Sequence, residues 1–251
     1  MSVDAEKMEA KGSTRDTVRV IVHALILALI VRVFLFQPFN IPSGSMIPTL
    51  LVGDYLFVSK YSYGYSRYSF PFGFNLFPGR IWASEPDRGD VVVFKLPRDN
   101  ETDYIKRVIG LPGDEIQMIH GVLHINGQAV EKVKIDDYVV TGSSGRERQM
   151  ARYKETLPNG VSYPVLDLVN DGFGDNTEVY KVPENHFFMM GDNRDNSTDS
   201  RFLSEVGFVP FVNLVGKAQV IFFSIDEDSS FWKVWDWPTE VRWDRIFSVV
   251  H

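Results

Sequence analysis

Residues 18–36 read Val18-Arg-Val-Ile-Val-His-Ala-Leu-Ile-Leu-Ala-Leu-Ile-Val-Arg-Val-Phe-Leu-Phe36, and Gln37-Pro38 follows directly. A membrane-spanning helix needs about 20 predominantly apolar residues. This stretch is long enough if Arg32 extends its charged end toward the nearer interface. A cleavable signal peptide has a shorter apolar core followed by an A-x-A site, and this pattern is not present here. Apolar residues on all sides argue against an amphipathic core helix. The stretch therefore predicts an uncleaved membrane anchor.

Basic residues flank this segment on one side only. Before or at its start stand Lys7, Lys11, Arg15 and Arg19, whereas the first basic residue beyond it is Lys60. The positive-inside rule therefore predicts that the N-terminus lies in the cytoplasm and the bulk of the chain outside it. We expect a cytoplasmic tail over 1–17, a transmembrane anchor over 18–36 and an extracytoplasmic domain over 37–251.

The composition excludes several classes of protein. The 251 residues contain Lys+Arg 26, Asp+Glu 33 and Cys 0, which gives a formal net charge of −7. An acidic chain of this kind lacks the basic face of a general nucleic-acid binder. The absence of cysteine excludes disulfides, thiolate metal sites, iron–sulfur clusters and a cysteine nucleophile. A chain of this length can bury a core without disulfides.

The region after the anchor has the pattern of short strands. Apolar runs rich in β-branched and aromatic residues are bounded by Gly, Pro, Asn or Asp, and they cover 55–58, 91–94, 104–109, 186–190 and 215–223. Val122–Ile125 and Gln128–Val130 flank Asn126-Gly127, a pair that favours a type I′ hairpin turn. No amphipathic helix is expected after residue 40. The fold class is therefore predicted to be mostly β, an antiparallel barrel-like or sandwich-like domain preceded by a single transmembrane helix.

Three other stretches have less specific patterns. Residues 61–77 combine many aromatic rings with Gly, Pro and Ser, so they cannot form one regular buried strand. They either cover a sheet edge or form an interfacial rim near the anchor. The same two interpretations apply to the C-terminal tryptophans Trp232, Trp235, Trp237 and Trp243. Residues 141–160 are rich in Gly, Ser and charge, which predicts a long exposed loop or hairpin tip.

The sequence gives little support for catalysis by histidine, by a metal or by a cofactor. His120 and His124 are interpreted as surface residues around one strand rather than as metal ligands. The dinucleotide, P-loop, H-E-x-x-H and G-x-S-x-G patterns are absent. One S-x-x-K at Ser230–Lys233 is attributed to chance, because S-D-N and K-T-G are missing. We expect no metal and no cofactor.

A candidate nucleophile follows the anchor in Ile41-Pro42-Ser43-Gly44-Ser45-Met46-Ile47-Pro48. Glycine allows the backbone to approach a substrate closely, and the prolines restrict the chain so that Ser45 is held in one pose. A serine just outside the span would meet a substrate emerging from the bilayer. The same composition also fits a polar linker between anchor and domain.

A candidate base lies in Tyr104-Ile105-Lys106-Arg107-Val108-Ile109. Strand alternation places Tyr104 and Lys106 on one face and Ile105 and Arg107 on the other, so one of the two cations is expected to face inward. A buried lysine becomes neutral readily and can then accept a serine proton, as in serine–lysine variants of the catalytic triad. The alternative is a solvated Lys-Arg pair on an edge strand.

A third segment, Met190-Gly-Asp-Asn-Arg-Asp-Asn-Ser-Thr-Asp-Ser-Arg201, collects many polar groups but lacks the ligand spacing of an EF-hand. In this order after a membrane span, the three segments are specific. From the anchor to about residue 223, the chain resembles type I signal peptidases, the membrane-anchored serine proteases that remove signal peptides from exported proteins.

The resemblance implies a role for each matching position. Ser45 would be the nucleophile and Lys106 the general base. Ser43 would supply its hydroxyl to the oxyanion hole, and Ser197 would orient the base. Asp199 and Arg201 would form a supporting ion pair, and Gly191 would be kept small beside the lysine. Substrate residues at positions −1 and −3, expected to be small, would bind beside Ile41, Met46, Leu50, Tyr104 and Ile105.

The resemblance also implies partners and a location. The expected partners are signal peptides of secretory preproteins and membrane phospholipid, with no nucleic acid and no metal. The expected location is the bacterial inner or plasma membrane, with one span and the catalytic domain on the periplasmic side. Two-span members of the family differ in this respect. Two other hypotheses remain: a membrane-tethered β-domain that only binds a partner, and a self-cleaving Ser–Lys regulator, which would require a DNA-binding domain in place of the anchor.

Overall fold

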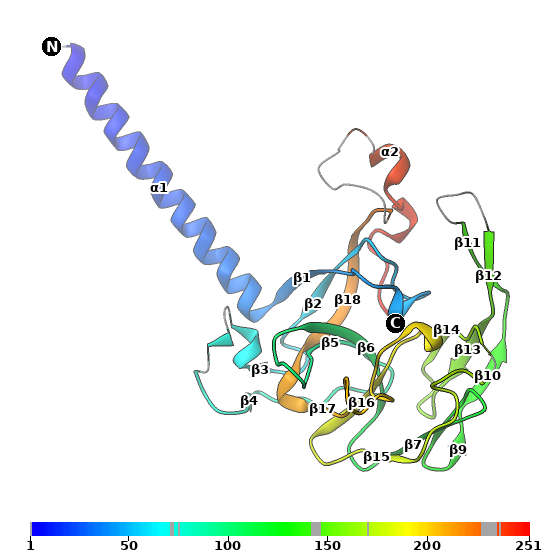
Figure 1. Cartoon of the computed structure of the whole chain (residues 1–251). Coiled ribbons are helices and arrows are strands. Elements are labelled where there is room, and N and C mark those ends of the chain that lie inside the picture. Colours follow the sequence, from blue (N-terminus) through cyan, green and yellow to red (C-terminus); the bar gives the residue numbers. More distant parts are fainter. Residues whose placement is uncertain are drawn as a thin grey trace.

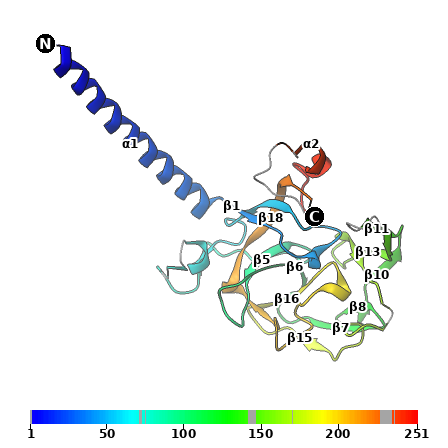
Figure 2. The same cartoon turned by 45° about the horizontal axis from the view of Figure 1, so that its top comes forward.

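The N-terminal helix α1 (Ser2–Phe34) extends away from a β-rich domain in the computed structural model (Figures 1 and 2). The structure describes residues 2–70, 73–74, 76–141, 147–169, 171–226, 235 and 237–251. Within α1 and the next residue, Thr14–Leu35 form an apolar helical stretch of 22 residues. In the described part of the chain, no other helix is long and apolar enough to cross a membrane.

Both ends of α1 differ from the predicted span of 18–36. The helix begins at Ser2 because residues 5–11 are Ala, Glu, Lys and Met, which favour helices. It ends at Phe34, because Phe36 already pairs with Ser59 in the first strand. Pro38 lies in that same strand, at the edge of the sheet, where a missing N–H is tolerated.

The main sheet is antiparallel and contains seven strands. Their order is β1 (Phe36–Asn40), β2 (Asp54–Ser59), β18 (Leu214–Ser224), β5 (Val91–Lys95), β6 (Asp103–Gly110), β16 (His186–Met190) and β17 (Val209–Pro210). The sheet curls around its own interior in Figures 1 and 2. β6 lies between β5 and β16 and is not an edge strand.

Smaller antiparallel sheets complete the domain. One contains β15 (Tyr180–Lys181), β7 (Glu115–Ile119), β8 (Val122–Ile125) and β9 (Gln128–Ala129), and another contains β10 (Glu131–Lys134), β13 (Arg152–Thr156) and β14 (Ser162–Leu166). Two pairs are β11 (Tyr138–Thr141) with β12 (Glu147–Met150) and β3 (Tyr65–Ser66) with β4 (Arg80–Ile81). Among the described residues, the short helical elements are α2 (Trp237–Glu240) and the 3-10 turns η1 (Gly44–Met46), η2 (Arg67–Ser69), η4 (Arg194–Asn196), η5 (Phe211–Asn213) and η6 (Trp243–Arg245).

The predicted fold class is confirmed. Each of the five apolar runs lies within or across one strand, namely β2, β5, β6, β16 and β18. Asn126 and Gly127 have φ angles of 53° and 74°, as a type I′ turn between β8 and β9 requires. Such agreement is expected where a signal is local, because alternation and turn chemistry act within a few residues.

The prediction for residues 141–160 is wrong in its second half. Residues 152–156 form β13, which pairs on both sides, with β10 and with β14. Glu155 is completely buried and Leu157 belongs to a hydrophobic core cluster. The charge of Glu155 is buried because an arginine from a distant segment neutralises it, which composition alone does not reveal.

The aromatic segment 61–77 forms no single strand, as predicted, and its first part packs against the end of α1. The Tyr65 hydroxyl donates to Phe34 O at 2.7 Å, and the two rings meet edge to face with centroids 5.6 Å apart. Tyr63 is buried and its hydroxyl donates to Asp90 Oδ2 at 2.8 Å. Part of this segment therefore attaches the helix to the domain.

Candidate active site

A cleft of about 390 Å³ opens where three segments far apart in the sequence meet. Its lining residues come from the segment after β1, from the start of β6 and from the segment after β16; they are Pro42, Ser43, Gly44, Ser45, Thr102, Asp103, Tyr104, Ile105, Lys106, Asn196 and Thr198. The candidate nucleophile and the candidate base therefore line the same cavity.

Ser45 and Lys106 are in direct contact in this cleft. Lys106 Nζ lies 2.6 Å from Ser45 Oγ and 3.0 Å from Ile105 O. Ser45 belongs to η1, whose two neighbouring residues Ser45 and Met46 are buried, so the segment is not the solvated linker that its composition also allowed. Lys106 pairs with Val92 of β5, and this pairing fixes its position in the sheet.

The environment of Lys106 favours the neutral amine. Its side chain is 3% exposed, and burial lowers the pKa of Lys106 to about 8, although the charges of Asp199 and Asp192 act in the opposite direction. Burial disfavours the charged form of a lysine because the ammonium loses its hydration. An amine that is neutral near pH 8 and 2.6 Å from a serine hydroxyl is able to accept its proton.

Ser43 stands at the same side of the cleft as Ser45. Its hydroxyl lies 3.5 Å from Ser45 Oγ, and Gly44 lies between them without a side chain. The hydroxyl of Ser43 and the backbone N–H of Ser45 are two donors beside one nucleophilic oxygen. This arrangement has the elements of an oxyanion hole.

Ser197, Asp199 and Arg201 form a buried chain of polar contacts. Ser197 Oγ donates to Asp199 Oδ2 at 2.8 Å, and Arg201 donates from Nε and Nη2 to the two oxygens of Asp199 at 2.9 and 3.0 Å. Burial alone would raise the pKa of Asp199, but the Arg201 charge and the hydrogen bonds outweigh it and lower that pKa. Asp199 is therefore an ionised acceptor that fixes the Ser197 hydroxyl.

Ser197 and Gly191 lie against each other beside the nucleophile. Among the described residues, the hydrogen bonds of Lys106 Nζ go to Ser45 and Ile105, not to Ser197. Gly191 lies against Ser197 and against the carbonyl of Ser45, since an ideal Cβ there would be 2.2 Å from Ser197 Oγ and 2.5 Å from Ser45 O. The small residue thus makes room for Ser197 and for the backbone of Ser45.

Strand alternation predicted that one cation of the Lys-Arg pair would face inward, and the structure buries both. Arg107 is 0% exposed and donates from Nε and Nη2 to the two oxygens of Asp192 at 2.9 and 2.7 Å. Its guanidinium also lies 4.0 Å from the centre of the Tyr163 ring. Both cations are buried because β6 is a central strand that is covered on both faces, which single-strand alternation does not indicate.

Asn193 is a residue that sequence reasoning missed. Its backbone N–H donates to Ser45 O at 3.1 Å and its side-chain amide donates to Gly44 O at 2.9 Å. The segment after β16 is thereby tied to both residues around the nucleophile. The signal was present in Gly-Asp-Asn-Arg-Asp-Asn-Ser, but composition alone does not tell which of its amides reaches another segment.

The expected substrate-binding residues fall into two groups. Tyr104 and Ile105 line the cleft. Ile41, Met46 and Leu50 are buried in the hydrophobic cluster that also contains Ile105, and they are not among the lining residues of the cleft. These three side chains pack in the core and hold the segment around Ser45 in place.

The residues that the sequence analysis set aside lie elsewhere. His120 is an exposed turn residue whose ring nitrogen is 3.3 Å from Asp171 Oδ1, and His124 contacts the Val122 carbonyl within β8. Ser230, Lys233 and Trp232 lie outside the described residues. Trp235 and Trp243 are exposed.

Comparisons with known proteins find relatives over most of the chain. The family described as "Signal peptidase, peptidase S26" matches residues 14–223. The Signal peptidase I of Rickettsia canadensis (strain McKiel) is 42% identical over 264 residues, covering 98% of this chain and 97% of the relative. That of Rickettsia typhi (strain ATCC VR-144 / Wilmington) is 44% identical over 240 residues, covering 89% of each. A crystal structure of a signal peptidase I from Enterococcus faecalis V583 matches at 26% identity and a TM-score of 0.33, over 53% of this chain and 97% of that chain.

Proposed function

The chain belongs to the signal peptidase family, peptidase S26, and on this basis we propose that Ser45 and Lys106 are its catalytic dyad. Membership makes the chain a serine endopeptidase that cleaves signal peptides from preproteins. The observation that carries the dyad is the 2.6 Å contact between Ser45 Oγ and Lys106 Nζ, together with the burial that lowers the lysine pKa to about 8.

Acylation begins with neutral Lys106. The amine takes the proton of Ser45 Oγ as this oxygen attacks the scissile carbonyl carbon. The tetrahedral oxyanion is stabilised by the backbone N–H of Ser45 and the hydroxyl of Ser43. The Lys106 ammonium then gives its proton to the leaving amine, the C–N bond breaks, and the signal peptide remains as an ester on Ser45.

Deacylation repeats the same steps with water. Neutral Lys106 removes a proton from a water molecule as the water oxygen attacks the ester carbonyl carbon. The ester bond to Ser45 Oγ breaks and that oxygen regains the proton from the lysine. Ser197, Asp199 and Arg201 take no part in bond making. They are positioning residues. The hydrogen bonds of Asp199 with Ser197 and Arg201 hold these side chains in fixed positions near the dyad.

Substrate selection follows from the cleft walls. An extended peptide would add as a strand beside the start of β6, where main-chain hydrogen bonds hold it. Tyr104 and Ile105 then face its alternate side chains, and their bulk favours small residues at positions −1 and −3, as in A-x-A. The tightly packed cluster under Ser45, with Met46 and Leu50 buried, leaves this wall little freedom to widen.

Membrane attachment is the remaining part of the proposal. The apolar stretch Thr14–Leu35 would cross the bilayer once. The basic residues at and before its start support an orientation with residues 1–17 in the cytoplasm and the domain from residue 37 onward on the outer side of a bacterial membrane. The cleft then lies on the side where translocated precursors emerge. Phospholipid would contact α1 and the exposed side chains Phe74 and Leu76 beside it.

The test is cleavage of a purified precursor carrying an A-x-A signal by the full chain in detergent micelles. Wild type should cut after the second small residue, and Ser45→Ala and Lys106→Ala should lose cleavage while keeping the wild-type circular dichroism spectrum. A precursor with Leu at position −1 should resist cleavage. Equal cleavage by Lys106→Ala would show that the base is wrong, and an inactive wild type would favour the tethered binding domain.

A further inference from the structure

Three carboxylates, one of them from the segment after β16, lie close together. Asp167 follows β14, Asp175 lies in the connection between β14 and β15, and Asp195 belongs to η4. One oxygen from each lies within 4.8 Å of the other two. Like charges this close repel one another, so the cluster requires a compensating partner.

Asp175 lacks a hydrogen-bond partner for one of its two carboxylate oxygens. Its side chain is 1% exposed, and its Oδ1 is buried without a hydrogen-bond partner. Its Oδ2 accepts the backbone N–H of Gly172 at 2.6 Å. A buried carboxylate oxygen without a donor is costly, because it has lost its water and gained nothing in return.

The unpartnered oxygen lies near Asp167, beside Gly121. An ideal Cβ on Gly121 would lie 3.1 Å from Asp167 Oδ2, 3.6 Å from Asp175 Cγ and 3.7 Å from Asp175 Oδ1. The two carboxylates therefore lie on the same side of Gly121. This residue has a φ of +71°, which favours glycine and keeps a side chain away from the two carboxylates.

The nearby charges do not balance the cluster. Lys132 Nζ contacts Asp167 Oδ2 and donates to Gly121 O at 2.7 Å. Asp195 Oδ2 accepts the backbone N–H groups of Leu168 and Val169 at 2.6 and 3.0 Å, which leaves its other oxygen for the cluster. One ammonium thus faces three carboxylates. Burial, Asp167 and Asp195 raise the pKa of Asp175, as expected where positive charge is scarce.

We propose that Asp167, Asp175 and Asp195 bind a calcium ion. Carboxylate oxygens are the ligands that hard divalent cations prefer. Calcium accepts a flexible geometry from several protein oxygens, whereas magnesium demands a near-ideal octahedron and usually keeps several waters. A site built from three carboxylates therefore fits calcium better. Water and nearby backbone carbonyls would complete the coordination.

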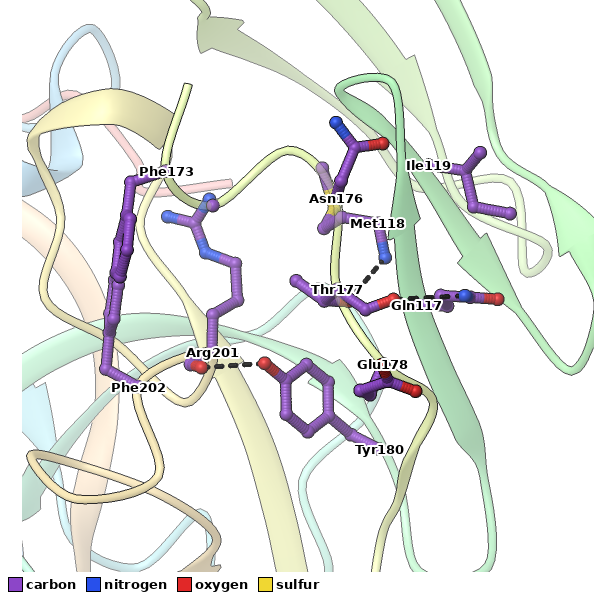
Figure 3. A pocket seen from close by; sticks show the side chains of 11 residues that line it. Gln117, Met118, Ile119, Phe173, Asn176, Thr177, Glu178, Tyr180, Arg201 and Phe202 are labelled. Carbon is purple, nitrogen blue, oxygen red and sulfur yellow. Dashed lines mark hydrogen bonds between the residues drawn. The ribbon is translucent and has the colours of Figure 1, made fainter. Parts of the chain in front are cut away.

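The ion would join two segments that shape the active site. Asp195 lies next to Arg194 and two residues before Ser197, in the segment that lines the cleft. Asp175 lies in the chain between Phe173 and Asn176, and Figure 3 shows Phe173 stacked on Phe202 with Arg201 beside them. Gly174 packs tightly on this arginine, since an ideal Cβ there would be 2.5 Å from Arg201 Nη1. The ion therefore acts as a positioning element and does not touch the reacting atoms.

The test uses the full chain in detergent micelles after removal of divalent cations with EDTA. Calcium titration by calorimetry should give one site per chain, with magnesium binding at least tenfold more weakly. Saturating calcium should raise the midpoint of thermal unfolding by about 3 °C or more. Asp175→Asn should abolish both effects, whereas the matched control Asp136→Asn, at an exposed carboxylate paired with Arg152, should keep both.

The stability of Asp175→Asn relative to wild type, measured in EDTA, provides a second check. Without an ion, Asp175→Asn should be at least as stable as wild type, because the substitution removes one of three repelling charges. If Asp175→Asn does not fold, the exposed residue Asp195 offers Asp195→Asn, which should weaken calcium binding tenfold or more. The proposal is overturned if wild type binds no calcium, or if calcium binds equally well when Asp175 or Asp195 is replaced. A proton shared within the cluster would then account for its stability.

Discussion

Gly191 lies so close to Ser197 that an ideal Cβ on the glycine would be 2.2 Å from the serine Oγ and 2.5 Å from its Cβ. The same Cβ would also approach Ser45 O to 2.5 Å. A side chain at position 191 must therefore displace the serine, the nucleophile's backbone or both. The glycine sets the spacing between the segment after β16 and the segment that carries Ser45.

Gly191→Ala should reduce kcat/KM for precursor cleavage by about tenfold or more, because a shift of the catalytic atoms by about 1 Å has a large effect on rate. The matched control is Gly110→Ala. Its Cβ would crowd Phe188 Cβ at 2.8 Å in the core, away from the cleft, so it should lower the unfolding midpoint but keep kcat. Equal kcat/KM in Gly191→Ala and wild type would contradict the tight packing.

The pH dependence of cleavage should report Lys106. Since its pKa is lowered to about 8, kcat/KM should rise about tenfold per pH unit below pH 8 and level off above it. Lys60 offers a matched control, because burial also lowers its pKa to about 8 while its Nζ donates to Ser69 O at 2.6 Å. Lys60→Met should retain this profile, and Lys106→Met should be inactive at every pH. If Lys60→Met loses this pH profile, the titrating group is Lys60 and not Lys106.

Ser43→Ala should lower kcat by about 10²–10³ with little change in KM, because the lost hydroxyl acts on the oxyanion and not on the bound substrate. Ser43→Thr, which keeps a hydroxyl, should retain most of the activity. Single-turnover kinetics on both variants will separate chemistry from binding. The oxyanion role is wrong if the alanine variant cleaves at the wild-type rate.

Glu155→Gln should destabilise the domain by about 3–5 kcal/mol, because it leaves the buried guanidinium of Arg194 without its counter-ion. The matched control is Glu205→Gln. Glu205 and its partner Arg98 have side chains that are 51% and 64% exposed, and breaking such a pair costs at most about 1 kcal/mol. Urea unfolding of both variants measures the difference, and a similar loss in each would contradict the importance of burial.

The apolar side chains beside α1 should bind lipid. Phe74 and Leu76 are 60% and 68% exposed and line a groove with Leu29 and Ile30 of the helix. In a chain lacking residues 1–35, Phe74→Ser combined with Leu76→Ser should weaken liposome binding by about tenfold. Phe173→Ser, at an exposed ring outside this groove, should leave liposome binding unchanged. Unchanged binding by the double variant would rule out a lipid contact here.

The elements that the sequence predicts correctly all rest on local patterns. The apolar stretch 18–36, the strands and the Asn126-Gly127 turn each depend on residues within a few positions of one another. Residue types likewise restrict the chemistry, because a chain without cysteine cannot use a cysteine nucleophile. The ends of α1 were less predictable, because pairing with β2 overrides helix propensity at Phe36.

The tertiary structure decides what is buried and which distant residues meet. Ser45 and Lys106 are 61 positions apart, and only the order of strands in the sheet brings them together. The same order covers both faces of β6, so Lys106 and Arg107 are both buried. Glu155 finds Arg194, and Asp167 and Asp175 approach Asp195, because separate sheets pack against the segment after β16. Burial and charge pairing depend on these long-range neighbours. They lower the pKa of Lys106 and leave Asp175 Oδ1 without a hydrogen-bond partner.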